Sequence, residues 1–266
     1  MSTWRGARWT ACGWLAALWL APVHAADPLA TLDADVRACI ERSLPRESMV
    51  QDHSVVMRGS GGWERRARWR VYWQRAPDGG ANVLFVVTEP KAEAGLKVLV
   101  QQPRAGAPAV YVYLPDLRRV RRVVGAGASS SVLGTDFSLD DALLARTLVD
   151  RGRTRRLSDE THAGRALYVL AAEADSGPWT RIETRIDQAS CLPLDTRFFT
   201  ANGTLGKTLS IDPADVELIA GHGVPRRLRA ANHLQGSSTE IAVDTVEVDV
   251  ALPAELFTLA ELEKSH

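Results

Sequence analysis

The sequence predicts a mainly β protein: a single curved antiparallel sheet of about ten strands that forms an unclosed β-barrel, covered by two or three α-helices. Short apolar or alternating segments recur between residues 67 and 248, and turn signals rather than helices separate most of them. Helical periodicity is confined to residues 28–44 and about 138–149. Because a large twisted sheet tends to curl, we expect the helices to pack in its concave side.

The first 25 residues have the pattern of a secretory signal peptide. Arg5 and Arg8 form a basic start, residues 9–23 form a short apolar stretch, and a cleavage pattern ends at Ala25. We therefore divide the chain into a signal peptide, 1–25, and one β-barrel domain, 26–266. The mature protein is expected to be periplasmic and not an integral membrane protein, since this apolar stretch is too short to cross a bilayer.

The charge balance gives no sign of a nucleic-acid-binding protein. The chain has 32 basic and 32 acidic residues, and the expected signal peptide contains two of the basic ones, Arg5 and Arg8. Cleavage would thus leave a slightly acidic protein without a basic excess. We predict no nucleic-acid partner.

Two segments are predicted to be helical. Residues 28–44 place apolar side chains at intervals of three and four, with Asp27 as the expected N-cap and Pro45 after the end. A second helix is expected from Ser138, which can cap its first turn, to about Val149.

The strongest strand signal is the segment Ala67 to Trp73. It places Ala67, Trp69, Val71 and Trp73 on one face, and Arg68, Arg70 and Tyr72, together with the preceding Arg66, on the other. Several later segments, such as 83–88, are apolar on both faces. The other expected strands cover residues 83–88, 96–100, 110–114, 165–171, 179–187, 192–199, 207–211, 225–232 and 239–248.

An open barrel with helices in its mouth can leave an apolar cavity between sheet and cover. Aromatic and aliphatic side chains on the inward faces are the candidate lining residues. The alternative is that the aromatic ones belong to an ordinary packed core. The candidates are Trp69, Val71, Trp73, Phe85, Val87, Val112, Leu114, Phe137 and Leu143.

Four arginines within five residues form a second candidate site: Arg118, Arg119, Arg121 and Arg122. Guanidinium groups can each chelate two oxygens, so this cluster could bind lipid headgroups or dock on an acidic partner. Alternatively, the arginines protect an edge strand from pairing with another sheet.

The cysteines indicate one disulfide. Cys12 lies in the expected signal peptide, which leaves Cys39 and Cys191 as a pair in an oxidising compartment. The alternative is two buried free thiols. Two cysteines alone are too few for a metal site.

The sequence shows no catalytic machinery. It contains no Gly-x-Ser-x-Gly elbow and no phosphate-binding loop, and its six histidines have no metal-ligand spacing. We predict a protein that is not an enzyme and that uses no cofactor and no metal ion.

The middle of the chain resembles a known family. Residues 110–122, VYVYLPDLRRVRR, and residues 133–141, LGTDFSLDD, are similar to the signature of the LolA-like outer membrane lipoprotein-sorting proteins. The resemblance implies an unclosed antiparallel β-barrel covered by helices, in the periplasm, with an apolar cavity for acyl chains. It also implies that Phe137 faces this cavity and that Ser138 starts a lid helix. The chain departs from the family in having a single glycine, Gly134, at this point, and the cysteine pair is not part of the family pattern.

These observations predict a non-enzymatic periplasmic carrier or chaperone. Its ligand would be a lipid, a lipoprotein acyl chain or another amphiphile, and an inner-membrane transporter is the candidate partner. The alternative function is a ligand-sensing adaptor of the same fold that docks on a membrane-bound regulator or transporter. A hydrolase of envelope lipids is a third interpretation.

Overall fold

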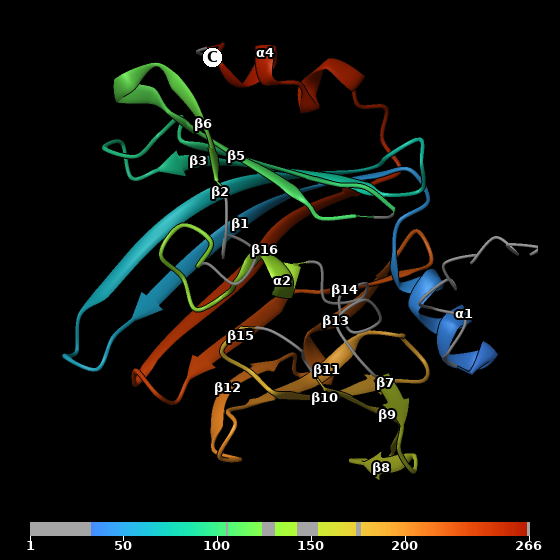
Figure 1. The fold of residues 1–266 in the computed structure, drawn as a ribbon. Coiled ribbons are helices and arrows are strands. Elements are labelled where there is room, and N and C mark those ends of the chain that lie inside the picture. The colour runs from blue at the N-terminus through green and yellow to red at the C-terminus, as the bar shows by residue number, and fades with distance from the viewer. Residues whose placement is uncertain (1–32, 105, 124–130, 143–153, 174–176, 265–266) are drawn as a thin grey trace, which may run out of the picture.

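One large antiparallel sheet forms the body of the protein in a computed structural model, which describes residues 33–104, 106–123, 131–142, 154–173 and 177–264 (Figure 1). Thirteen of its 14 strands follow each other in the order β6-β5-β4-β3-β2-β1-β16-β15-β12-β11-β10-β9-β7, and β8 pairs with β9. The two ends of this order, β6 and β7, do not pair with each other, so the barrel is unclosed. The predicted fold class is confirmed. The expected signal peptide lies outside the described residues.

The first half of the sheet, which we define as β1 to β6, is a meander in which each strand pairs with the next one along the chain. A long-range pairing between β1 and β16 joins it to the second half, which we define as β7 to β12 with β15 and β16. The strands of the first half are β1 (Ser48–Arg58), β2 (Glu64–Arg75), β3 (Ala81–Glu89), β4 (Lys97–Gln102), β5 (Ala109–Leu114) and β6 (Arg119–Val123).

The second half begins with β7, at Thr154. It also carries a separate hairpin of β13 and β14. The strands are β7 (Thr154–Arg156), β8 (Glu160–His162), β9 (Arg165–Glu173), β10 (Arg181–Asp187), β11 (Pro193–Phe199), β12 (Leu205–Ser210), β13 (Val216–Ile219), β14 (His222–Pro225), β15 (Arg227–Asn232) and β16 (Ser237–Val248).

The sheet has more strands than the sequence predicted. The ten expected strands are close to β2–β5, β9–β12, β15 and β16, whereas β1 and several short strands were not recognised. Strand β1 gives a poor apolar signal because Gln51 and His53 occupy inward positions in its first half. Polar residues at inward positions remove the period-two contrast by which a strand is recognised.

The helices are short. They are α1 (Ala34–Ser43), α2 (Leu139–Ala142) and α4 (Leu259–Leu262), with 3₁₀ turns η2 (Pro115–Leu117), η4 (Pro213–Asp215) and η5 (Ala254–Phe257). Helix α1 follows Asp33 and ends before Leu44, close to the end expected at Pro45. The expected cap Asp27 and the continuation of the second helix to Val149 lie outside the described residues.

The main core lies on the concave face of the first half. It contains inward side chains of β1 to β5, together with Val132 and Leu139 from the segment that precedes and begins α2. Trp69 and Phe85 pack edge to face within it, with ring centroids 6.3 Å apart. Helix α2 lies over this concave face in Figure 1.

The convex face of the first half is also covered, which the sequence analysis did not anticipate. Leu84, Leu99 and Tyr113 pack there against Phe257 of η5 and Leu262 of α4. Lys97 fixes this C-terminal cover, since its ammonium group donates hydrogen bonds to the carbonyls of Leu262 (3.3 Å) and Lys264 (2.8 Å). Burial on both faces explains why the middle strands are apolar throughout.

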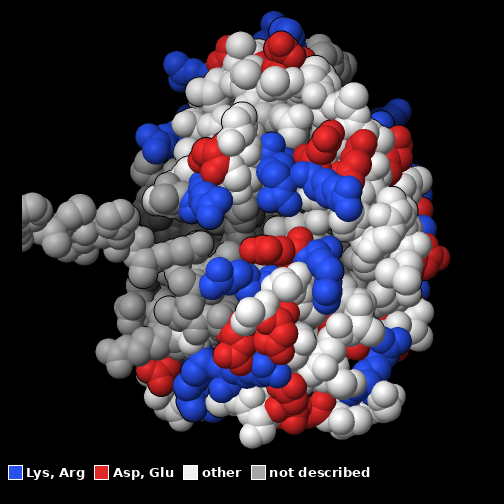
Figure 2. Space-filling view, turned by 90° about the vertical axis from the view of Figure 1, so that its right-hand side faces the viewer, with Lys and Arg blue, Asp and Glu red and all other residues white. Residues whose placement is uncertain are grey.

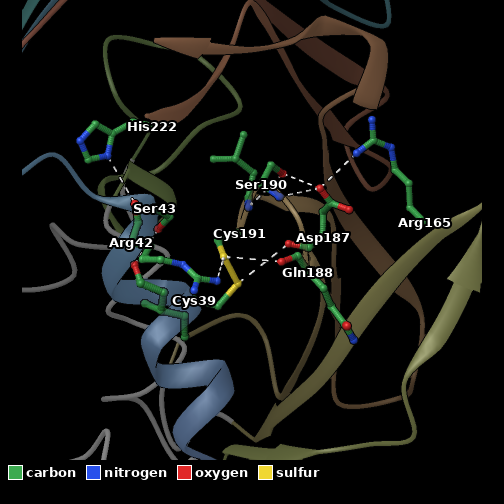
Figure 3. The surroundings of a disulfide bond; sticks show 11 residues. Cys39, Arg42, Ser43, Arg165, Asp187, Gln188, Ser190, Cys191 and His222 are labelled. Atoms are coloured by element: carbon green, nitrogen blue, oxygen red, sulfur yellow. Dashed lines mark hydrogen bonds and ion pairs between the residues drawn. A yellow bond between two sulfur atoms is a disulfide. The ribbon is translucent and has the colours of Figure 1, made fainter. Parts of the chain in front are cut away.

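A disulfide joins α1 to the second half (Figure 3). Cys39 lies on α1 and Cys191 lies just before β11, and both are buried together with Ile40, Leu170 and Ile186. Asp187 orders the turn before Cys191 by accepting hydrogen bonds from the backbone N–H (2.9 Å) and hydroxyl (2.6 Å) of Ser190. The predicted pairing is present.

Candidate functional site

The concave side contains a cavity of about 320 Å³. Its walls come from both halves of the sheet, from the end of α1 and from residues 131–142, which we call the lid segment. Five of the predicted lining residues lie on it: Trp69, Val71, Trp73, Phe85 and Phe137. A mostly apolar cavity of this size suits the apolar part of a small ligand.

The remaining predicted lining residues lie elsewhere. Val87 and Val112 belong to the apolar cluster of the concave face but do not border the cavity. Leu114 is half-buried at the end of β5, also away from the cavity. Leu143 lies outside the described residues. Binding of a ligand by the five lining residues stays a prediction.

The lid segment is tied to the sheet by Asp136. Its carboxylate accepts hydrogen bonds from the hydroxyls of Ser237 and Thr239 (2.8 Å) on β16, and Thr239 in turn accepts one from the backbone N–H of Asp136. Leu133 and Gly134 precede it with φ of 53° and 79°, which turns the chain back over the concave face. This anchoring places Phe137 against the cavity, as the family resemblance implied.

Ser138 and Asp141 cap the start of α2 reciprocally. The backbone N–H of Ser138 donates to Asp141 (2.6 Å), and the backbone N–H of Asp141 donates to the Ser138 hydroxyl (3.3 Å). Asp141 also forms an ion pair with Lys207 of β12, and these two side chains are only 2% and 6% exposed. A buried pair of this kind fixes position, because separation of the partners leaves an uncompensated charge. Both polar attachments of the lid segment, to β16 and to β12, are thus to the second half of the sheet.

Strand β1 contributes lining residues that sequence reasoning missed: Met49, Gln51 and His53. The sequence feature that could have revealed them is the alternation along β1, where Gln51, His53, Val55 and Met57 all face inward. Other residues missed come from the second half and from β14, among them Leu192, Thr196, Leu209, Ile211, Val224, Ile241 and Val243. These residues are far apart in the sequence, and the order of the strands in the curved sheet brings them to one cavity.

His53 is a neutral group in the cavity wall. Burial lowers its pKa from 6.5 to about 4, although the carboxylates of Asp244 and Asp52 oppose the shift. One ring nitrogen, Nε2, lies 3.0 Å from Oε1 of Gln51. The other, Nδ1, is buried without a hydrogen-bond partner among the described residues.

The predicted arginine cluster occupies an edge of the sheet. Arg118 follows η2 with φ of 46°, and Arg119, Arg121 and Arg122 lie on the edge strand β6, all four exposed. None of them forms an ion pair with another described residue. Their position agrees with the edge-protection alternative and also leaves them accessible to a partner, so the docking role stays a prediction.

The surface charges are mixed. Figure 2 shows acidic and basic side chains interspersed over one face of the molecule. Within the described part of the chain, no cluster of three or more His, Cys, Asp or Glu side chains could hold a metal ion. No described helix has the length and apolar character needed to cross a membrane.

Comparison with solved structures identifies the fold. A domain described as an outer membrane lipoprotein-sorting protein, from Vibrio parahaemolyticus, has a TM-score of 0.78 and 21% identity, covering 86% of this chain and 97% of that one. A DUF1329 family protein from Desulfovibrio piger has a TM-score of 0.78 and 22% identity, covering 89% and 99%. A LolA superfamily protein from Nitrosomonas europaea has a TM-score of 0.65 and 19% identity, covering 85% and 97%.

A family model described as that of an uncharacterized protein matches residues 79–264. The chain belongs to the family of this model, and the solved structures show that its fold is LolA-like. No curated protein sequence matches it. These likenesses establish the fold, and the function has to be inferred from the cavity.

Proposed function

We propose that this LolA-like protein is a non-enzymatic periplasmic carrier that shelters the acyl chain of a lipid or lipoprotein in its concave cavity. An inner-membrane transporter would supply or receive the ligand. The proposal rests on one observation: the cavity is bordered by Trp69, Val71, Trp73, Phe85 and Phe137 in a sheet whose two ends remain unpaired. The signal-peptide pattern of residues 1–25 and the disulfide between Cys39 and Cys191 support an oxidising compartment outside the cytoplasm.

Burial of alkyl chain provides the driving force. Each methylene group removed from water contributes about 0.8 kcal/mol, so a chain of several methylenes is held by the walls without any charged contact. The lid segment is attached at Asp136 and Asp141, and it presents Phe137 to the cavity.

Binding of a fluorescent fatty acid tests the proposal. Delipidated protein is expected to bind the probe with a stoichiometry near one. Val71→Trp fills the cavity from β2 and should weaken binding by at least about tenfold, since the indole occupies the volume of the chain. The matched control is Val56→Trp, because Val56 faces the opposite side of β1 from Val55 and does not border the cavity. Absence of binding across a broad lipid panel would contradict the carrier function.

A second candidate function is a ligand-sensing adaptor, and the exposed arginines of β6 favour it. Their side chains reach solvent at a sheet edge, where an acidic partner could pair with them. Replacement of Arg118, Arg119, Arg121 and Arg122 by serine separates the two candidates. Loss of partner binding with lipid binding intact supports the adaptor, whereas weaker lipid binding supports headgroup recognition.

A further inference from the structure

Two polar side chains interrupt the apolar wall of the cavity. Gln51 and His53 lie two residues apart on β1, so their side chains share one face of the strand. Both border the cavity and both are only 9% exposed. Their neighbours on β2 are Val71 and Trp69, which belong to the apolar wall. A buried polar pair in such a place needs hydrogen-bond partners, because each unsatisfied group costs free energy.

The contact between the two side chains sets the tautomer of His53. Oε1 of Gln51 is a carbonyl oxygen and can only accept, so Nε2 of His53 donates across the 3.0 Å that separates them. The imidazole is neutral, as burial lowers its pKa. Nδ1 then carries a lone pair and acts as an acceptor. No described residue donates to it, and it is closed to water.

Gln51 supplies the complementary donor. Its amide nitrogen makes no hydrogen bond to a described residue and, unlike Nδ1 of His53, is not sealed from solvent. The pair therefore offers a donor that is open to the cavity and an acceptor beside it. A ligand must displace the adjoining wall slightly to reach Nδ1.

We propose that Gln51 and His53 form a polar subsite for the secondary amide of an N-acyl amphiphile, in which the amide N–H donates to Nδ1 of His53 and the side-chain amide of Gln51 donates to a separate acceptor of the ligand. This inference rests on the proposed carrier function and adds to it a preference for ligands whose acyl chain is attached through an amide. An ester presents the oxygen but no donor, so it leaves Nδ1 unsatisfied. The subsite thus selects N-acyl over O-acyl ligands.

Two probes with the same acyl chain test this selectivity: N-dodecanoylglycine methyl ester and O-dodecanoylglycolic acid methyl ester. They differ only in that the amide N–H of the first is an ester oxygen in the second. Each competes with a fluorescent fatty acid for delipidated full-length mature protein. The amide probe should bind about tenfold more tightly than the ester probe, the usual consequence of leaving one buried acceptor unpaired. Equal binding of the two probes overturns the subsite and leaves the carrier function intact. Failure of both probes and of the fatty acid overturns the carrier function as well.

Two variants assign the selectivity to His53. His53→Leu removes the acceptor and should bring the two affinities together, chiefly by weakening the amide probe. His53→Asn keeps a polar atom near the position of Nδ1 and should retain part of the preference. Thermal melting checks that each variant is folded. A tenfold preference that persists in folded His53→Leu would show that another group selects the amide.

Discussion

The two halves of the curved sheet differ in the character of their convex faces. In the first half, the convex face is apolar and η5 and α4 cover it, with Phe257 buried against Leu84 and Leu99. In the second half, the convex face carries partly exposed ion pairs, such as Arg185 with Glu160 and Arg197 with Asp195. The first half is therefore a three-layer structure, whereas the convex face of β10 and β11 in the second half lies partly in water.

The sequence patterns of the halves differ for the same reason. The segment Val83–Val87 of β3 is apolar at every position, which suits burial on both faces. The segment Asp195–Phe198 of β11 alternates, with Thr196 and Phe198 inward and Asp195 and Arg197 outward. The difference teaches that uniform apolarity in an antiparallel strand indicates a second cover, even where the cover lies far away in the sequence.

Removal of the disulfide should have the largest effect, and it concerns the second half. The bridge closes a loop of 152 residues, so Cys39→Ala with Cys191→Ala is expected to lower the free energy of unfolding by about 4 to 5 kcal/mol. Urea unfolding of the double variant measures this loss. Reduction of the wild-type protein should produce a similar one. An effect below about 1 kcal/mol would mean that α1 is held by packing alone.

The convex cover of the first half should have the next largest effect. Phe257→Ala removes a buried ring from the contact with Leu84 and Leu99, and we expect a loss of about 3 to 4 kcal/mol. The control lies on the convex face of the second half, where Arg197→Ala should cost less than about 1 kcal/mol because its pair with Asp195 is half-exposed. Similar losses for both variants would contradict the contrast between the halves.

Acid should weaken the junction between the halves. His53 lies on β1 beside β16, and its pKa of about 4 in the folded protein is below its ordinary value of 6.5. The unfolded chain therefore binds a proton first, and stability present above pH 6.5 is lost as the pH falls toward 4, by about 3 kcal/mol in total.

The measurement is the free energy of unfolding at pH 7, 5 and 4 for the wild type and for His53→Leu, which lacks the titrating group. The variant should lose much less stability in this window. Carboxylates such as Asp187 affect stability at lower pH than His53. Burial opposes the ionisation of Asp187, but hydrogen bonds from Ser190 and the charge of Arg165 keep its pKa below the ordinary value of 3.8. A wild-type profile that is flat between pH 6.5 and 4 would contradict the neutral state of His53.

Part of the site could be predicted from the sequence because local pattern carries it. Trp69, Val71 and Trp73 alternate along one strand, and the motif around Phe137 encodes its own turn and helix cap. Gln51 and His53 escaped recognition, since two polar residues at inward positions hide the strand to which they belong. The role proposed for Nδ1 of His53 depends on a cavity whose walls come from both halves, so the local sequence around His53 does not predict it.

By itself, the amino-acid sequence determined the strand periods, the turns between them and the pairing of the two cysteines that follow the expected signal peptide, because these depend on neighbouring residues and on composition. Only the tertiary structure decided that β1 pairs with β16, that the C-terminal segment covers the convex face and that Lys207 meets Asp141. The physical reason is distance along the chain: contacts between remote segments depend on how the whole sheet curves, and no short stretch of sequence contains that curvature.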